Sequence, residues 1–293
     1  MNKRILFVVF LTVLAAIPCR AQNLRVMTFN IRYDNKSDSR SGNGWDSRKD
    51  SLCRYVREVG PDVFGMQEVL HNQLEDLTER LDDWTYVGVG RDDGKRKGEY
   101  NPVFYRKSRF NLLAKGWFWL SPTPEVPSFG WNSACRRMAV WVVLEDKESK
   151  ERFLFCNSHF DHVSLEARKH SAMLCKERLS SLSKEYSSND SRLPLVFTAD
   201  FNTNSQEETY GLLRDWEFPI KDVWRVADMS EGGPATFNDW GRRPNVAWSK
   251  IDFIFVSAEA KVTKAVIHSS NMGGGHFLSD HNAHWAEINV SNK

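Results

Sequence analysis

The sequence predicts a four-layered α/β sandwich, in which two packed, mainly antiparallel β-sheets are flanked by helices. Three observations predict this fold class. Predicted strands come mostly in successive runs, helices interrupt both halves of the chain, and several neighbouring strands are joined by links too short for a crossover helix. The short links disfavour a single doubly wound parallel sheet. The composition, 41% hydrophobic and 27% charged residues, is that of an ordinary globular domain.

The first segment, residues 1–21, has the pattern of a secretory signal peptide. Lys3 and Arg4 precede an apolar run, and small residues follow at the positions that a signal peptidase recognises. The run is too short to cross a bilayer comfortably. We expect cleavage to leave one domain, residues 22–293, secreted or in a periplasm. The alternative is a lipoprotein attached through Cys19, which the preceding proline fits poorly.

Cleavage would change the charge of the chain. The whole sequence has 40 Lys and Arg and 38 Asp and Glu, and residues 1–21 hold three of the cations and none of the acids. The remaining chain therefore has 37 cations against 38 acids. Proteins that grip a nucleic acid backbone usually carry a basic excess. The overall charge therefore disfavours such a task and leaves a local basic patch open.

Four cysteines remain after cleavage, at positions 53, 135, 156 and 175. An exported chain could pair them in three ways, and their spacing matches no zinc pattern. Cys156 and Cys175 lie in apolar or helical surroundings, where free buried thiols are the alternative.

Alternation and helical spacing predict the first elements. Leu24–Ile31 alternates as a strand does, and the polar stretch 33–45 reads as a loop. Apolar residues at helical spacing and the stop signal Gly60-Pro61 predict a helix over 48–59. A buried strand over 62–68 and a short helix over 73–81 follow.

The rest of the chain is richer in strands, separated by turn signals such as Asp92-Asp93-Gly94. A long helix over 164–184 has Ala167, Leu174 and Leu182 at helical spacing. A buried apolar strand begins at Leu195. The remaining predicted strands are 84–89, 102–106, 112–120, 138–144, 153–159, 251–256, 262–268 and 283–290.

The strand from Leu195 ends in a carboxylate and an amide two residues apart, Asp200 and Asn202. Side chains in extended chain repeat with a period of two, so both point to the same side. Burying them is costly without partners, and a metal ion, a phosphate or a reacting water would be suitable. The alternative is a simple strand-ending turn.

Other polar residues repeat this placement at the ends of predicted strands. Each has a structural explanation of its own: Glu68 could cap a helix, and His159 could be a satisfied core histidine. Polar groups that face one common rim form a site, and eight of them are hard to explain separately. The eight residues are Asn30, Glu68, His159, Asp200, Asn202, Asp252, Asp280 and His281.

Six motifs in order resemble those of the endonuclease/exonuclease/phosphatase superfamily, the DNase-I-like group of deoxyribonucleases, sphingomyelinases, inositol phosphatases and deadenylases. They span nearly the whole chain after the leader. The segment 116–141 looks like an exported bacterial subgroup. The motifs are Thr28-Phe29-Asn30, Gln67-Glu68, Asn157-Ser158-His159, Thr198-Ala199-Asp200-Phe201-Asn202, Lys250-Ile251-Asp252-Phe253-Ile254 and Ser279-Asp280-His281.

The resemblance implies hydrolysis of phosphate esters with Mg²⁺ or, alternatively, Mn²⁺. Mg²⁺ takes oxygen ligands from one or two carboxylates and from substrate phosphate. Glu68 is the first candidate ligand, with Asn30 and Asp280 beside it. Some members carry a second acid where this chain has Arg32, which cannot bind a metal and could instead contact phosphate.

The resemblance also implies roles for the other motif residues. Asp200 would activate the attacking water, and Asn202 would orient Asp200 or donate to a phosphoryl oxygen. His159 and His281 would donate to the non-bridging oxygens, where charge accumulates in the transition state. Asp252 would hold His281 protonated and correctly turned.

Two further residues are secondary candidates. Glu99 stands where nuclease members place an acid that pairs with the first histidine, here His159, although an exposed loop acid is the alternative. Arg136 is a candidate phosphate clamp, because a guanidinium binds phosphate in a fork.

The substrate stays open among a small molecule, a lipid headgroup and nucleic acid. A nuclease could use a local basic patch at 95–97 and 242–243, and a lipid or phosphosugar enzyme could use the aromatic cluster between Trp117 and Trp131. A phospho-ligand binding protein with this fold is the non-catalytic alternative. The sequence indicates no stable protein partner and no transmembrane segment after cleavage.

Overall fold

The computed structural model describes residues 23–187 and 191–290, so the expected signal peptide and Cys19 lie outside the described part. Two sheets confirm the predicted fold class. In the first sheet, the strands lie in the order β10 (Met229–Gly232), β12 (Lys261–His268), β15 (Ala283–Asn289), β1 (Asn23–Asn30), β2 (Val63–Gln67), β4 (Val103–Arg106) and β3 (Trp84–Val87). In the second sheet, the order is β5 (Phe110–Trp119), β6 (Met138–Asp146), β7 (Arg152–His159), β8 (Leu195–Asp200), β11 (Asp252–Ser257) and β9 (Ile220–Asp222).

Most neighbouring strands run antiparallel, as the short links predict. Three pairs are parallel: β1 with β2, β10 with β12, and β7 with β8. The parallel pairs β1–β2 and β7–β8 are each joined by a segment that contains a helix, which a parallel connection requires. These pairs bring the carboxyl ends of neighbouring strands to the same edge of each sheet.

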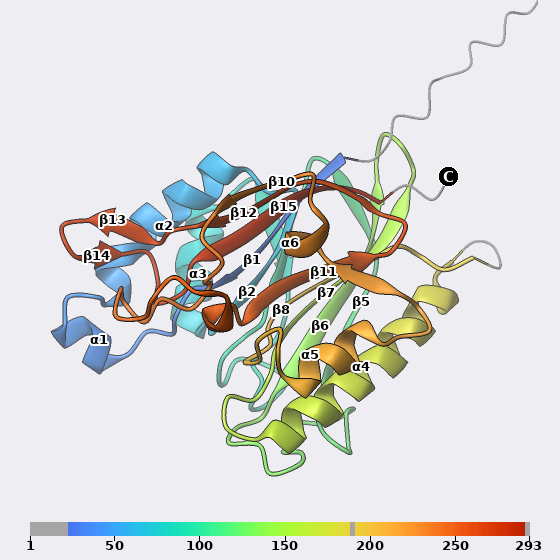
Figure 1. The fold of residues 1–293 in the computed structure, drawn as a ribbon, viewed down its shortest axis with the longest axis horizontal. Helices are drawn as coiled ribbons and strands as arrows, with labels where there is room; N and C mark the ends of the chain where they lie inside the picture. Colours follow the sequence, from blue (N-terminus) through green and yellow to red (C-terminus); the bar gives the residue numbers. More distant parts are fainter. Residues whose placement is uncertain (1–22, 188–190, 291–293) are drawn as a thin grey trace, which may run out of the picture.

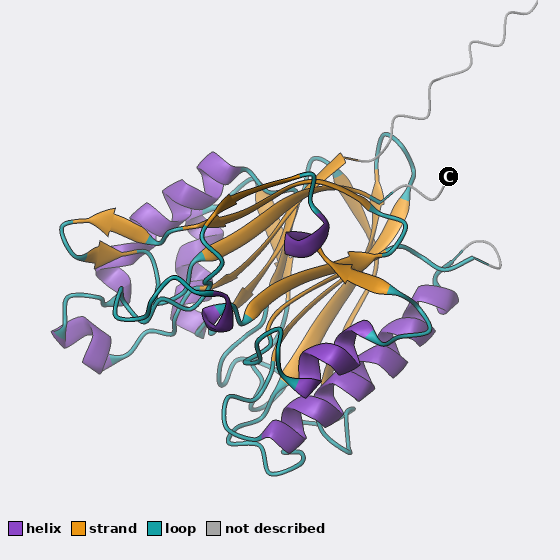
Figure 2. Cartoon of the chain, in the orientation of Figure 1, coloured by secondary structure: helices purple, strands orange, loops and turns teal. Residues whose placement is uncertain are grey.

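Helices cover the outer face of each sheet and complete the four layers. The helices α2 (Trp45–Val59) and α3 (His71–Arg80) pack on the first sheet. On the second sheet, α4 (Leu165–Glu185) and α5 (Glu208–Arg214) pack side by side, as Figure 1 shows at its lower right. Figure 2 shows the two sheets facing each other between these helical layers.

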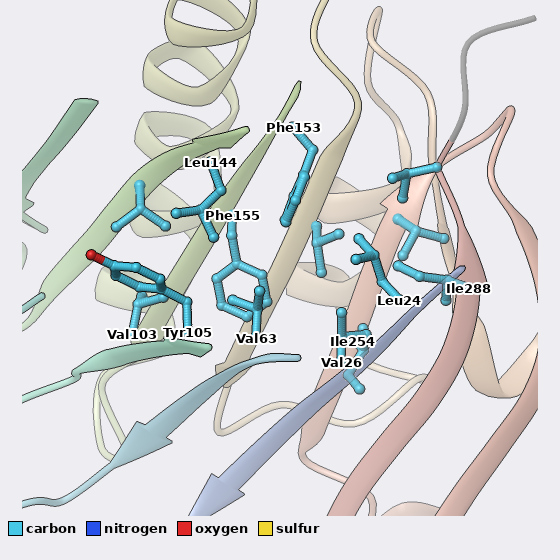
Figure 3. Close-up of a cluster of buried hydrophobic side chains, with 14 of the residues drawn as sticks. Leu24, Val26, Val63, Val103, Tyr105, Leu144, Phe153, Phe155, Ile254 and Ile288 are labelled. Carbon is cyan, nitrogen blue, oxygen red and sulfur yellow. The ribbon is translucent and has the colours of Figure 1, made fainter. Parts of the chain in front are cut away.

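An apolar core lies between the two sheets. Val26 and Val63 of the first sheet pack with Phe155 and Ile254 of the second, and all four side chains are fully buried (Figure 3). Burying one side chain of this size contributes about 1.5–3 kcal/mol to stability. The alternating pattern of the strands therefore fixes which face of each sheet meets the other.

Local sequence signals set the helix ends. Apolar residues of α2 face the sheet, and Gly60 ends the helix in the left-handed conformation with φ 61°. The Ser164 side chain caps α4 by accepting a hydrogen bond from the backbone N–H of Ala167. The predictions from helical spacing are confirmed for both helices.

The prediction of a loop over 33–45 is wrong at its centre, where α1 (Lys36–Arg40) forms one short helix. Its N-cap is Asn35, whose side chain accepts from the backbone N–H of Asp38. Asn and Asp favour both caps and turns, so the composition did not separate the two. Short elements also occupy regions with no predicted element: α5, β9, α6 (Val223–Val226), β10, η1 (Ala247–Ser249), β13 (Asn271–Gly273) and β14 (His276–Phe277).

All four cysteines in the described ranges are free thiols. Burial raises the pKa of Cys53 to about 12, and Cys156 of β7 and Cys175 on the inner face of α4 lie fully buried in the core between that helix and the second sheet. The alternatives for Cys156 and Cys175 were a disulfide bond or a free buried thiol, and in the structure both are free buried thiols. Over the same ranges, no helix has the length and apolar character needed to cross a membrane.

A buried polar network joins the sheets just beneath their carboxyl edge. The Asn157 side chain donates to the carbonyl oxygens of Met66 (2.8 Å) and Pro102 (3.1 Å) and accepts from the Gln67 amide at 2.6 Å. The Thr198 hydroxyl also donates to Asn157. These bonds tie β2 to β7 and β8, the strands that carry the predicted site residues.

Candidate active site

Strand register brings the predicted residues together at one edge. In the second sheet, Asp200 pairs with His159 on one side and with Asp252 on the other. In the first sheet, Asn30 pairs with Gln67, the residue before Glu68. The ends of five strands from two sheets therefore meet at one rim.

Asp200 lies at the centre of this rim and is 2% exposed. Its Oδ2 accepts from Asn30 Nδ2 at 2.9 Å, and its Oδ1 accepts from the backbone N–H of Asn202 at 2.9 Å. Burial and the neighbouring Asp252 carboxylate raise the pKa of Asp200 to about 7. A carboxylate with this pKa can take a proton near neutral pH.

His281 pairs with Asp252 in the same row. Its Nδ1 lies 2.9 Å from Asp252 Oδ2, and its Nε2 lies 3.8 Å from Asp200 Oδ2. Burial alone would lower the pKa of His281, but Asp252 and Asp200 outweigh it and raise this pKa to about 10. The imidazole is therefore protonated at neutral pH, and the Asp252 bond leaves its Nε2–H free to donate.

His159 has different surroundings. The Asn202 side chain lies 3.1 Å from His159 Nε2, and Asp200 Oδ2 lies 3.5 Å from the same nitrogen. Burial and the charges of Arg137 and Arg91 lower the pKa of His159 well below its ordinary value. Without a bound anion, His159 is therefore neutral at neutral pH, whereas His281 is protonated.

Glu99 lies behind His159, at 3.9 Å between Oε2 and Nδ1. This distance exceeds that of a hydrogen bond. The Glu99 carboxylate instead accepts two bonds from the Arg91 guanidinium, at 2.6 and 2.8 Å. The predicted pairing with His159 is therefore an electrostatic contact, and Arg91 is the stronger partner.

The three candidate metal ligands lie on the other side of Asp200. Asn30 Nδ2 donates to Glu68 Oε1 at 3.0 Å, and its Oδ1 accepts from the backbone N–H of Arg32. The Arg32 guanidinium lies 4.0 Å from Glu68 Oε2 and 3.6 Å from Asp280 Oδ2. Burial and the Glu68 charge raise the pKa of Asp280, so this pair of acids favours a neighbouring cation.

These residues fit a divalent ion. The Glu68 and Asp280 carboxylates converge on one cationic group, Arg32, and both are the hard oxygen donors that Mg²⁺ takes. Asn30 turns its amide nitrogen, not its oxygen, to the carboxylates, so in this arrangement it orients Glu68 and Asp200. A second set, Asp200, Asp252 and His281, offers one ligand atom each within 4.8 Å, but its His281 Nδ1 is already paired with Asp252.

Three residues of the rim adopt the left-handed backbone region, which non-glycine residues rarely occupy. Their φ angles are 60° for Arg32, 62° for Glu68 and 47° for Asn202. Each stands just beyond the end of β1, β2 or β8. Such turns cost about 1–3 kcal/mol each and persist where the surrounding structure holds them, which is typical of functional sites.

The rim opens into a cleft of about 690 Å³. Aromatic and charged side chains that the motifs did not predict form part of its walls: Asp38, Arg91, Arg137, His162, Phe237, Asp239, Trp240 and Arg242. Most come from the irregular stretches 133–137, 161–163 and 236–243, where no periodic pattern was available to place them.

Arg136 does not line this cleft, contrary to its predicted role as a clamp. Its guanidinium lies 3.8 Å from Asp92 and stacks over the Phe129 ring, while the next residue, Arg137, lines the cleft. Successive residues in extended chain point to opposite sides, so the sequence pattern Arg136-Arg137 could not tell which of the two faces inward. The predicted basic patch is divided in the same way: Arg242 lines the cleft and residues 95–97 do not.

The chain resembles known proteins over most of its length. The model of the endonuclease/exonuclease/phosphatase family matches residues 27–163. The crystal structure of an endonuclease/exonuclease/phosphatase from Bacteroides vulgatus is 39% identical, with a TM-score of 0.85 over 92% of this chain and 100% of that one. A family protein from Bacteroides thetaiotaomicron is 33% identical, with a TM-score of 0.86 over 93% and 100%. The mannosyl-6-phosphatase Bt3783 of that organism is 35% identical, with a TM-score of 0.84 over 90% and 99%.

The two-sheet fold and its polar rim are those of a hydrolase. Identity of 39% over the whole of a relative goes beyond a shared fold. The chain belongs to the endonuclease/exonuclease/phosphatase family.

Proposed function

We propose that the protein is an exported, Mg²⁺-dependent phosphoesterase, in which Asp200 activates a water for in-line attack on phosphorus. The observation that carries this proposal is the placement of Asp200. Two fixed donors, Asn30 and the backbone of Asn202, orient both oxygens of its carboxylate, and a protonated histidine lies beside it. Asp200 can accept a proton and the protonated His281 can donate one, and the two lie less than 4 Å apart, which suits hydrolysis by acid–base catalysis.

Glu68 and Asp280 would hold the ion, with Asn30 keeping Glu68 in place. When bound, Mg²⁺ would polarise the phosphoryl group and offset charge on the leaving oxygen. Arg32 would move its charge away from the two acids towards substrate phosphate, because both acids then face the ion. The pair Arg32 and Asp38, 2.8 Å apart, keeps that guanidinium at the edge of the cleft.

The histidines would act on the phosphoryl oxygens. His281, protonated because Asp252 supports its charge, would donate from Nε2 to a non-bridging oxygen. Binding of an anion would favour the protonated form of His159, which could then donate from the other side. Asn202 would keep His159 turned towards the reacting phosphorus.

The relatives and the cleft walls support a proposal for the substrate class. A relative that is 35% identical over its whole length is called a mannosyl-6-phosphatase. The cleft offers Trp240 and Phe237 beside Asp239, an aromatic and acidic wall of the kind that stacks on a sugar ring and accepts from its hydroxyls. We therefore propose the phosphate ester of a small polyhydroxylated molecule, ahead of a lipid or nucleic acid.

A hydrolysis screen tests the reaction. The purified residues 22–293 are assayed on p-nitrophenyl phosphate, bis(p-nitrophenyl) phosphate, mannose 6-phosphate, sphingomyelin and plasmid DNA, each with Mg²⁺ and with EDTA. We expect hydrolysis with Mg²⁺ and none with EDTA. Asp200→Asn should lower kcat by about a hundredfold or more. The matched control is Asp82→Asn in an exposed turn. Near-normal turnover in a folded Asp200→Asn variant would exclude the assigned base.

Export is tested separately, by expression of the full chain in a Gram-negative host. We expect the mature protein in the periplasm or medium, with Gln22 as its first residue by mass spectrometry. A chain that keeps residues 1–21, or one with a lipid on Cys19, would contradict cleavage and release.

A further inference from the structure

Arg137 is a buried guanidinium that lacks a full set of partners. It precedes β6, is 4% exposed and lines the cleft beside His159. Its Nε and Nη1 are buried, and neither has a hydrogen-bond acceptor. A buried charged donor without an acceptor is costly, so this arrangement calls for an anion in the cleft.

The nearest carboxylate cannot supply the missing acceptors. Asp161 Oδ2 lies 3.8 Å from Arg137 Nε, beyond hydrogen-bond distance. The Asp161 oxygens already accept from three backbone N–H groups, those of Ala134, Val163 and Ser164, at 2.8–3.0 Å. Asp161 therefore shapes the loop, and Arg137 Nε is left without a hydrogen-bond acceptor.

One bond holds the Arg137 side chain in position. Its Nη2 lies 3.0 Å from Nδ1 of His162. A guanidinium only donates, so this histidine nitrogen is the acceptor. The bond fixes the plane of the guanidinium while two of its nitrogens remain without partners.

The same cluster does not suit a cation. Cys135, Asp161 and His162 offer one ligand atom each within 4.8 Å. Arg137 uses the Nδ1 lone pair of His162 and adds a positive charge beside it, which a metal ion would have to overcome. The cluster is therefore better suited to an anion.

The other arginines of the cleft are already neutralised. Arg32 is bonded to Asp38 at 2.8 Å, Arg91 to Glu99 at 2.6 Å and Arg242 to Asp239 at 2.6 Å. Among the described arginines that line the cleft, Arg137 alone has no hydrogen-bonded carboxylate. Guanidinium donors without a hydrogen-bonded acceptor, close to the acid–base residues, thus distinguish Arg137 from the other arginines of the cleft.

We propose that Arg137 binds a terminal oxygen of a phosphomonoester and thereby selects monoesters over diesters; this inference rests on the proposed function. A monoester has three terminal oxygens and, with a second pKa near 6, about two negative charges at neutral pH. A diester has two terminal oxygens and one charge. Its second ester oxygen carries an alkyl group where a monoester offers a charged acceptor to Arg137.

The test compares two esters in four variants. Initial rates are measured on p-nitrophenyl phosphate and bis(p-nitrophenyl) phosphate for the wild type, Arg137→Ala, Arg137→Lys and Arg54→Ala, the last being an exposed control on α2. We expect the wild type to prefer the monoester. Loss of a charge-assisted bond in Arg137→Ala should lower kcat/KM about 10- to 100-fold on the monoester and less than about threefold on the diester. Arg137→Lys should recover part of the loss.

A binding measurement gives a second readout. Calorimetric titration with inorganic phosphate, with Mg²⁺ and in EDTA, should show affinity weakened by a similar factor in Arg137→Ala and unchanged in Arg54→Ala. Dimethyl phosphate should bind the wild type and Arg137→Ala alike. The variant Arg136→Ala tests the competing assignment, and a selective monoester loss there would return the role to Arg136.

The outcomes separate this inference from the proposed function. Equal losses on both esters in Arg137→Ala, or a wild type that prefers the diester, would overturn monoester selection while Mg²⁺-dependent hydrolysis stands. No hydrolysis of any ester, combined with phosphate binding through Arg137, would overturn the proposed function and retain the anion site. If Arg137→Ala does not fold, Arg137→Lys tests the assignment instead, because lysine keeps the positive charge but has a shorter side chain. An unchanged ester preference and an unchanged phosphate affinity in Arg137→Lys would then overturn the assignment.

Discussion

Asn30 and Asp200 join the two sheets at the active rim: the amide of Asn30, which ends β1, donates to the carboxylate of Asp200, which ends β8, at 2.9 Å. The same amide nitrogen donates to Glu68 at 3.0 Å. One side chain of the first sheet therefore sets the position of both the proposed base and the proposed metal ligand. The relative placement of the sheets is part of the chemistry.

Replacing Asn30 should therefore impair turnover more than substrate binding. In Asn30→Ala, Asp200 loses a donor that stabilises its charged form, so its pKa rises above about 7. We expect kcat to fall about 10- to 100-fold and the acid limb of the pH–rate profile to move to higher pH. Initial rates from pH 5 to 9 measure both effects. Asn111→Ala, on the exposed side of β5, is the control, and a profile like that of the wild type in both variants would contradict the role of Asn30.

Some residues of the rim could be predicted from the sequence and others could not, and the difference has a physical explanation. A motif at a strand end fixes its own position, because strand register carries Asn30, His159, Asp200 and Asp252 to the same edge. The two-sheet fold and most elements were predicted for the same reason, since alternation and helical spacing are local signals. Residues such as Arg137 come from irregular chain, and only the folded backbone decides whether Arg137 or its neighbour faces inward.

Glu68 should dominate binding of the divalent ion. Its carboxylate and that of Asp280 are the acids that converge on Arg32, and loss of one negative ligand weakens a hard cation site. We expect Glu68→Gln to weaken Mg²⁺ binding by about tenfold or more in calorimetric titration, with the fold retained. Glutamine keeps the size of the side chain at this position, where the backbone φ is 62°. Glu75→Gln on the exposed side of α3 is the control, and equal affinities in the two variants would place the ion elsewhere.

His284 should make the protein sensitive to acid. Its ring is fully buried, and burial together with the Lys250 charge holds its pKa well below the ordinary value. Below pH of about 6.5 the unfolded chain takes up a proton here that the folded chain does not. The free energy of unfolding therefore falls as pH falls, by up to about 1.4 kcal/mol per pH unit from this group.

The variant His284→Leu removes this proton uptake. Urea unfolding at pH 7, 6 and 5 should show that the stability of the variant relative to the wild type increases as the pH falls. His276→Leu, at an exposed position of β14, is the matched control. A constant difference between His284→Leu and the wild type across these pH values would show that folded and unfolded chains take up the proton on His284 alike, and would contradict the lowered pKa.

Gly65 should be essential for the contact between the sheets under the rim. A Cβ atom at this position would lie 2.3 Å from the Asn157 side chain and 2.6 Å from the Thr198 hydroxyl, both members of the buried network that joins β2 to β7 and β8. Gly65→Ala must displace Asn157 from its bonds to Gln67 and to the Met66 carbonyl, which leaves buried polar groups without partners. We expect the free energy of unfolding to fall by about 2–4 kcal/mol.

The control for Gly65→Ala is a glycine with open space around it. In α5, a Cβ atom on Gly211 would meet nothing within 4 Å, and alanine favours a helix by about 0.5–1 kcal/mol. Gly211→Ala should therefore stabilise the protein while Gly65→Ala destabilises it, as measured by urea unfolding. Because Gly65 lies three residues before Glu68, a Gly65→Ala variant that still folds should also bind Mg²⁺ less tightly. Equal stability of the two variants would mean that the sheets can separate slightly without cost, and that the network does not set their spacing.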